Sequence, residues 1–165
     1  LARQVLREIS RQQARAHALV NRHYCLQNPK GWAGYGPDCW GLTASDDPGG
    51  YVAHSPTDDT GTITPTAALS SFPFVPDEAM PVLRHLHDDL GDRIWGDAGF
   101  VDAFCPTRDW VAESRLAIDQ GPIVIGLENH RSGLIWRLVS HRPEVQRGLQ
   151  ALGFTAPYLA LPRLA

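Results

Sequence analysis

The sequence has no long hydrophobic run and no cluster of basic residues. Its longest apolar stretches, such as residues 122–127, are far too short to cross a bilayer core of about 30 Å, so we expect no membrane-spanning segment. The net charge is −3, and lysine and arginine are scattered along the chain. Nucleic acids and anionic membrane surfaces are bound through basic patches. The composition therefore gives no support for a nucleic-acid partner.

Cysteine is scarce, and the common catalytic and metal-binding motifs are absent. Cys25, Cys39 and Cys105 make an odd number without CxxC spacing, which signals neither a zinc site nor a disulfide framework. One bridge between Cys25 and Cys39 stays open as a possibility. His85 and His87 are two residues apart and do not share a helix face, so we expect no metal site. The sequence also lacks a G-x-S-x-G elbow, a G-x-G-x-x-G loop and a Walker loop.

What the sequence does contain is typical of one ordinary folded domain. It has 165 residues, of which 43% are hydrophobic and 20% are charged, and this is enough apolar material for a core. The first residues, Leu1 to Leu19, have the pattern of an amphipathic helix. Arginines and a glutamate interrupt any apolar run there, so this stretch is not a signal peptide. We expect the chain to start inside a fold.

Helical periodicity covers most of the chain. Apolar residues recur at three- and four-residue steps in the first segment, which should end before Asn28-Pro29. Thr64 and Pro65 are a natural N-cap and first position of a second helix. Further helices are expected at about 77–90, 118–130, 134–139 and from Pro143 to Leu152. No segment shows a sustained period of two, so the sequence predicts an all-α fold. Inner helices that are small or uniformly apolar alternate with outer amphipathic ones, which is typical of helical hairpins stacked into a toroid.

Two loops combine tryptophan, glycine and carboxylates between these helices. The first runs from Cys39 to Tyr51 and contains Trp40 and Asp46 before a Pro-Gly-Gly turn. The second, residues 93–104, repeats this chemistry with Trp95 and Asp97. A tryptophan offers a flat face for a ligand, and a carboxylate can move a proton, so the two loops suggest one shared cleft. The alternative is a solvated loop with a buried tryptophan and aspartates that cap turns.

Several longer motifs carry a family resemblance. They occur in order along the chain: Tyr24-Cys25 with Asn28-Pro29, Gly34-Tyr35-Gly36, residues 39–46 (CWGLTASD), residues 63–73 (ITPTAALSSFP), residues 90–96 (LGDRIWG), residues 117–122 (AIDQGP) and Pro143-Glu144-Val145-Gln146. From about Leu19 to Phe154 the chain resembles the glucoamylase-like, or glycoamylase, family. That family contains bacterial endo-β-1,2-glucanases and is related to the cyclisation domains of cyclic β-1,2-glucan synthases.

The resemblance implies an (α/α)6 barrel whose cleft holds a β-glucan between two carboxyl groups. The whole chain, residues 1–165, looks like the C-terminal half of one such barrel. The upstream part of the family, including a Tyr-Asn-Glu type segment that supplies a catalytic acid, has no counterpart before Leu1. Asp97 stands where family members commonly carry glutamate, so the carboxylate is kept but is one methylene shorter. The missing upstream portion is itself an expected partner.

Glycoside hydrolysis by two carboxyl groups requires no cofactor, and we expect none. The candidate catalytic residues are Asp46 and Asp97. The candidate substrate-binding residues are Trp40, Trp95, Tyr51, Thr64, Asp119 and Gln120, with capping as the alternative role of Asp119 at a helix N-terminus. The predicted function is a β-glucan hydrolase or transglycosylase. The alternative is a glucan-binding or scaffold module without the acid. Families that degrade glucans are usually exported, so we expect a periplasmic or secreted protein.

Overall fold

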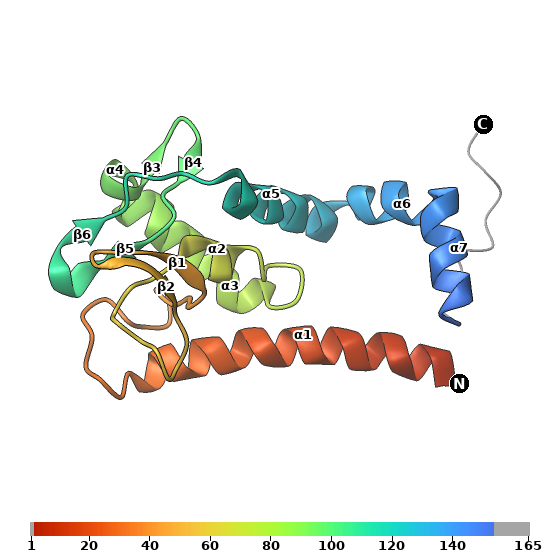
Figure 1. Ribbon diagram of the computed structural model, residues 1–165, viewed down its shortest axis with the longest axis horizontal. Coiled ribbons are helices and arrows are strands. Elements are labelled where there is room, and N and C mark those ends of the chain that lie inside the picture. Colours follow the sequence, from red (N-terminus) through yellow and green to blue (C-terminus); the bar gives the residue numbers. More distant parts are fainter. Residues whose placement is uncertain (1, 154–165) are drawn as a thin grey trace.

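The chain is mainly helical, with three small antiparallel hairpins on one side (Figure 1). The computed structural model describes residues 2–153, and side chains from residue 11 onward. Its helices are α1 (Ala2–Gln27), α2 (Pro65–Leu69), α3 (Pro76–Arg84), α4 (Gly91–Ile94), α5 (Ala117–Arg131), α6 (Leu134–Ser140) and α7 (Pro143–Ala151). A π-helical turn spans His85–Asp89 and a 3-10 turn spans Pro106–Arg108.

The predicted helices are present. Helix α2 lies at the centre of their packing. It begins at Pro65 after Thr64, as the sequence predicts, although the Thr64 side chain makes no capping hydrogen bond. Helix α2 packs against α1, α3 and α5, so it links the lower and upper layers of the molecule (Figure 1). The described residues form an open arrangement in which α1 runs along one side and α5, α6 and α7 along the other.

The sequence did not predict the hairpins. Strands β1 (Ala44–Asp47) and β2 (Gly50–Ala53) form the first, β3 (Trp95–Gly96) and β4 (Gly99–Phe100) the second, and β5 (Phe104–Cys105) and β6 (Trp110–Val111) the third. Each strand has two to four residues, which is too short for alternation to be visible in the sequence. The first and second hairpins lie in the two loops that contain tryptophan and carboxylates. The third hairpin begins where the second loop ends.

One apolar core joins α1, α2, α3 and the hairpins. Its largest fully buried side chains include Trp40, Phe100, Ile63 and Leu69. Cys25, Cys39 and Cys105 are separate buried thiols, so the possible Cys25–Cys39 bridge is not formed. Burial raises the pKa of the Cys25 thiol to about 11 and that of the Cys39 thiol to about 12, which keeps both protonated and inert.

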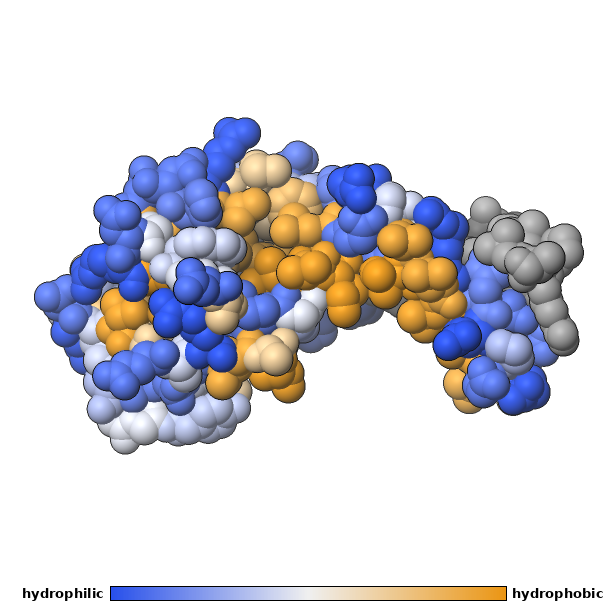
Figure 2. All heavy atoms as spheres, turned by 90° about the horizontal axis from the view of Figure 1, so that it is seen from above, coloured by the Kyte–Doolittle hydropathy of each residue, from blue (hydrophilic) through white to orange (hydrophobic). Residues whose placement is uncertain are grey.

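A second group of apolar side chains is exposed on α5 and α6. Figure 2 shows the apolar surface gathered along these helices. The exposed residues are Ile118, Val124, Ile125, Leu134, Trp136, Leu138 and Val139. A contiguous apolar patch on a folded protein usually marks a surface that another element covers. In the part of the chain that the structure describes, no helix is both long and apolar enough to cross a membrane.

Candidate active site

Three carboxyl groups from separate elements meet beside the first hairpin. Asp46 lies on β1, Asp102 in the connection between β4 and β5, and Asp119 in the first turn of α5. The backbone N–H of Asp46 donates to Asp102 Oδ2 at 2.7 Å, and Ser114 Oγ donates to Asp46 Oδ2 at 2.5 Å. Asp102 in turn shares a hydrogen bond with the Asp119 carboxyl group. We refer to Asp46, Asp102 and Asp119 as the carboxyl cluster.

The carboxyl cluster changes the proton affinity of Asp119. Burial, the hydrogen bond with Asp102, and the negative charges of Asp102 and Asp46 raise the pKa of Asp119 to about 6. Two carboxyl groups can hydrogen-bond only when one of them holds a proton. Neither Asp102 Oδ1 nor Asp119 Oδ2 receives a hydrogen bond from an N–H or hydroxyl donor. The pair can therefore hold one proton, which Asp119 loses as the pH rises through about 6.

The three members of the carboxyl cluster differ in their exposure to solvent. Asp102 is only 1% exposed, whereas Asp46 and Asp119 are half-buried. Because Asp102 is closed to solvent and contacts both others, it holds them in place. Thr66 adds to this by donating from Oγ1 to the Asp119 carbonyl at 3.0 Å. Asp46 and Asp119 are the two members that are partly exposed to solvent.

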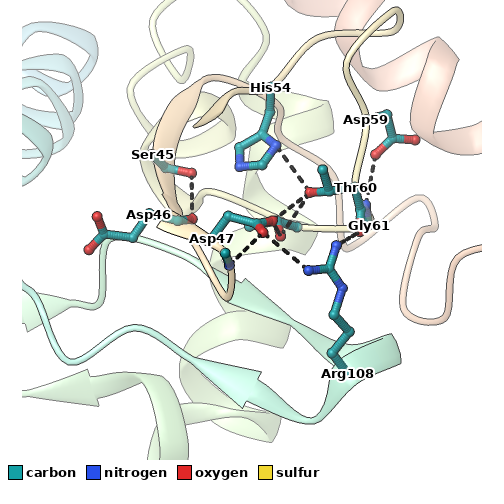
Figure 3. A network of polar contacts seen from close by, with 10 residues as sticks. Ser45, Asp46, Asp47, His54, Asp59, Thr60, Gly61 and Arg108 are labelled. Atoms are coloured by element: carbon teal, nitrogen blue, oxygen red, sulfur yellow. Dashed lines mark hydrogen bonds and ion pairs between the residues drawn. The ribbon is translucent and has the colours of Figure 1, made fainter. Parts of the chain in front are cut away.

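Asp47, the next residue along β1, anchors the hairpin that carries Asp46 (Figure 3). Neighbouring side chains on a strand point to opposite faces, so Asp47 points away from the carboxyl cluster. Its carboxylate accepts hydrogen bonds from Thr60 Oγ1 at 2.7 Å and Thr62 Oγ1 at 2.8 Å, and pairs with Arg108 at 3.1 Å. Burial opposes ionisation, but these donors outweigh it and lower the pKa of Asp47 to about 2.

Thr60 links this anchor to its surroundings. Its carbonyl accepts from Arg108 at 2.7 Å, and its Oγ1 lies 3.2 Å from His54 Nδ1. Since the Thr60 hydroxyl gives its proton to Asp47, the imidazole of His54 must donate through Nδ1. The network in Figure 3 thereby joins β1, the loop of residues 54–62 and the turn that carries Arg108.

Another buried carboxylate, Asp59, fixes the aromatic loop that precedes the hairpin. It accepts from Tyr35 Oη at 2.6 Å, Trp32 Nε1 at 2.8 Å, Tyr24 Oη at 2.9 Å and the Gly61 N–H at 3.0 Å. Burial raises the pKa of Asp59, but these four donors outweigh it, so the pKa is lower than usual. Burial and the bond to Asp59 raise the pKa of Tyr24 to about 12. These tyrosines are therefore structural donors.

The structure separates the sequence-predicted aromatic residues by exposure. Trp40 is in the core with none of its surface exposed, so its ring offers no face to a sugar, and we correct its predicted role to packing. Tyr51 is 71% exposed and pairs across the hairpin with Asp46. Directly opposed residues share a face of a hairpin, so Tyr51 lies beside the carboxyl cluster. Trp95 is 45% exposed and packs edge-to-face on Phe100.

The other predicted site residues have different positions. Asp97 is exposed in the turn of the β3–β4 hairpin and forms no hydrogen bond with the carboxyl cluster among the described residues. Thr64 is fully buried, and its hydroxyl donates to Ser45 Oγ at 3.0 Å, which makes it a framework residue. Gln120 binds the backbone of Phe100 with its side-chain amide.

Sequence reasoning missed Asp102 and Ser114. Asp102 stands six residues after the end of β3 in the second tryptophan loop, and nothing in its local pattern distinguishes it from a turn residue. Its role depends on contact with residues 56 positions before it and 17 after it, and no local periodicity reports such contacts.

Comparison with known proteins places these residues in a family. The family model named Glycoamylase, described as "Putative glucoamylase", matches residues 9–143. An exo β-1,2-glucooligosaccharide sophorohydrolase from Parabacteroides distasonis is 44% identical over 137 residues, which are 82% of this chain and 19% of that protein.

Two solved structures share the arrangement. A "putative glucoamylase" from Bacteroides uniformis is 57% identical with a TM-score of 0.86, over 90% of this chain and 36% of the other. The endo-β-1,2-glucanase from Chitinophaga pinensis, solved with sophorotriose and glucose, is 51% identical with a TM-score of 0.82, over 86% of this chain and 34% of the other. The chain thus spans about a third of these structures and about a fifth of the sophorohydrolase.

Proposed function

Since this chain belongs to the glycoamylase family, we propose that it forms part of a glycoside hydrolase that acts on β-1,2-linked glucan. The observation that carries the proposal is the carboxyl cluster, in which Asp119 has a pKa of about 6. Hydrolysis of a glycosidic bond needs one carboxyl group to protonate the leaving oxygen and a second to activate water or attack the sugar. A carboxyl group that titrates near neutral pH suits such proton transfer.

In this proposal Asp46 and Asp119 act on the substrate and Asp102 positions them. Above about pH 6, Asp119 is ionised and accepts a proton from water, while Asp46 lies beside it with Ser114 as donor. The acid partner is the glutamate that the family carries upstream. The carboxyl cluster therefore supplies the base side of the reaction. The catalytic role of Asp97 stays a prediction. Its carboxylate would lie on the rim formed by the β3–β4 hairpin.

Tyr51 and Trp95 are the proposed sugar-stacking residues. Both rings are exposed. The hairpin of Tyr51 carries Asp46, and the hairpin of Trp95 is hydrogen-bonded by Gln120, the residue that follows Asp119. Apolar faces of sugar rings pack on aromatic rings, whose polar edges stay hydrated. The two hairpins then form the walls of the substrate cleft.

Residues 1–165 are proposed as a C-terminal portion of an (α/α)6 barrel. Two observations support this: relatives of the same local structure are much longer than this chain, and α5 and α6 expose an apolar face. We propose that other helices of the barrel cover this face. The expected export to the periplasm or beyond is a proposal of the same kind, and fractionation of cells that express the full protein tests it.

The decisive experiment measures release of oligosaccharides from β-1,2-glucan by the full protein and by Asp46→Asn and Asp119→Asn variants. Loss of acid–base catalysis typically costs about 10²–10⁴-fold, so we expect each substitution to lower kcat by about 100-fold or more. Asp58→Asn, in an exposed loop, is the matched control and should keep full activity. The proposal would be wrong if the wild-type protein released no sugar, or if both Asp46→Asn and Asp119→Asn kept their activity.

The second candidate is a non-catalytic glucan-binding module. It is favoured by the exposed Tyr51 and Trp95 rings, which can hold a sugar without any catalytic acid. Calorimetry of residues 1–165 with β-1,2-glucooligosaccharides distinguishes the two. Heat of binding without sugar release in the full protein supports the module, and no heat at millimolar ligand excludes it.

A further inference from the structure

The β3–β4 hairpin is too short to hold its own position. Each strand has two residues, and the cross-strand pairs are Trp95 with Phe100 and Gly96 with Gly99. Isolated two-stranded hairpins are marginal in water even when they are longer. The hairpin nevertheless carries Trp95 and Asp97. Something outside the hairpin has to fix it.

Gln120, in the first turn of α5, supplies that contact. Its Nε2 donates to the Phe100 carbonyl at 2.9 Å, and its Oε1 accepts from the Phe100 N–H at 3.2 Å. The side-chain amide therefore pairs with both backbone groups of one residue, as a neighbouring strand would do. Arg115 adds a third bond by donating from Nε to the Gly99 carbonyl at 3.3 Å. The outer edge of β4 is thus occupied by side chains.

The backbone of Gly99 is adapted to this contact. Its φ is +95°, which favours glycine, and a Cβ atom there would lie 2.2 Å from Gln120 Oε1. Any other residue would push the amide away from Phe100. The hairpin and the Gln120 side chain are therefore fitted to each other.

Gln120 follows Asp119 directly, so one turn of α5 touches both the carboxyl cluster and the hairpin. We propose that Gln120 is a positioning residue that fixes the β3–β4 hairpin, and with it the Trp95 ring, at a set distance from Asp119. One N–H of its amide and its carbonyl oxygen are used on the backbone of Phe100. The part of this inference that concerns substrate rests on the proposed function.

The first test measures the hairpin without reference to activity. Gln120→Met keeps the length of the side chain and removes the donor and the acceptor. In the full protein, hydrogen exchange of residues 95–100 should accelerate by about tenfold, the usual effect of one net hydrogen bond. Gly99→Ala should do the same by displacing the amide, and Gln150→Ala, on the exposed face of α7, should change nothing in the hairpin.

The second test separates positioning from general damage. Because the surroundings of Asp119 are untouched in Gln120→Met, the acid limb of the pH profile should stay near pH 6. The KM for β-1,2-glucooligosaccharides should rise by about three- to tenfold, while kcat changes by less than about twofold, as expected when a binding wall moves.

Each result has a defined meaning. Unchanged exchange of residues 95–100 in Gln120→Met overturns the inference. Faster exchange with an unchanged KM also overturns it, because Gln120 would then fix the hairpin without any effect on substrate binding. If the wild-type protein has no activity on β-1,2-glucan, the proposed function fails, and the exchange experiment alone decides whether Gln120 fixes the hairpin.

Discussion

The proton affinity of Asp119 is a property of its neighbours. Burial raises its pKa first, and the bond to Asp102 and the charges of Asp102 and Asp46 raise it further. An aspartate that is free in water titrates near pH 3.9. A folded-state pKa above this value means that protonation stabilises the fold, and this contribution is lost as the pH rises from about 4 through about 6. The same titration should appear in catalysis.

We predict that kcat/KM of the full protein on β-1,2-glucan rises with pH along a limb centred near pH 6, because ionised Asp119 is the proposed base. In Asp102→Asn the negative charge beside Asp119 is gone, so the limb should move to lower pH by about one unit, within the range that a nearby like charge produces. The pH profile of kcat/KM measures this. The Asp58→Asn control should retain the wild-type limb, and an Asp102→Asn profile at or above the wild-type position would contradict the assignment.

At the scale of elements, sequence patterns predicted the helices well and the hairpins not at all. The apolar spacing of α1, α3 and α7 and the Thr64–Pro65 start of α2 are local signals, so they could be read directly. The hairpins depend on contacts that local patterns do not contain, such as the anchoring of β1 by Thr60, Thr62 and Arg108. The same contrast between local signals and long-range contacts applies to the candidate site. Asp46 and Asp119 stood out locally, whereas Asp102 gains its role only from the folded arrangement.

Gly41 shows how one element depends on another, and it gives a prediction. Its φ is +145°, and a Cβ atom there would lie 2.8 Å from the Thr64 carbonyl at the start of α2. Gly41→Ala in the full protein should therefore lower the free energy of unfolding by about 2–4 kcal/mol, through strain and a backbone clash. Chemical denaturation measures this change.

Gly148 is the matched control for Gly41. It lies inside α7, and a Cβ atom added there would meet no neighbouring atom within 4 Å. Gly148→Ala should raise the free energy of unfolding by about 0.5–1 kcal/mol, since alanine favours a helix interior over glycine. Equal effects of the two substitutions would show that the approach of Gly41 to α2 has no energetic weight.

At the scale of the whole molecule, the apolar face of α5 and α6 predicts opposite effects in two contexts. Val124 and Leu138 are 64% and 57% exposed. If other helices of the barrel cover them, Val124→Glu and Leu138→Glu should each destabilise the full protein by about 2 kcal/mol or more, because a charge replaces buried apolar surface. In residues 1–165 alone, the same substitutions should reduce self-association, because they remove exposed apolar surface.

Light scattering of residues 1–165 and denaturation of the full protein measure the two effects. Asp58→Asn, at an exposed position in the loop of residues 54–62, should leave both unchanged. A full protein that tolerates both glutamates without loss of stability would show that nothing covers this face.

The neighbouring pair Asp46 and Asp47 has a consequence for how the family can vary. One carboxylate faces the carboxyl cluster and the next is bound to Thr60, Thr62 and Arg108, and only the alternation of strand β1 keeps the two apart. A single-residue insertion or deletion in β1 would exchange their faces and bury the wrong charge. Sequence length should therefore be invariant between Gly41 and Gly50 in active relatives, while changes of length are tolerated in the exposed loop around Pro56.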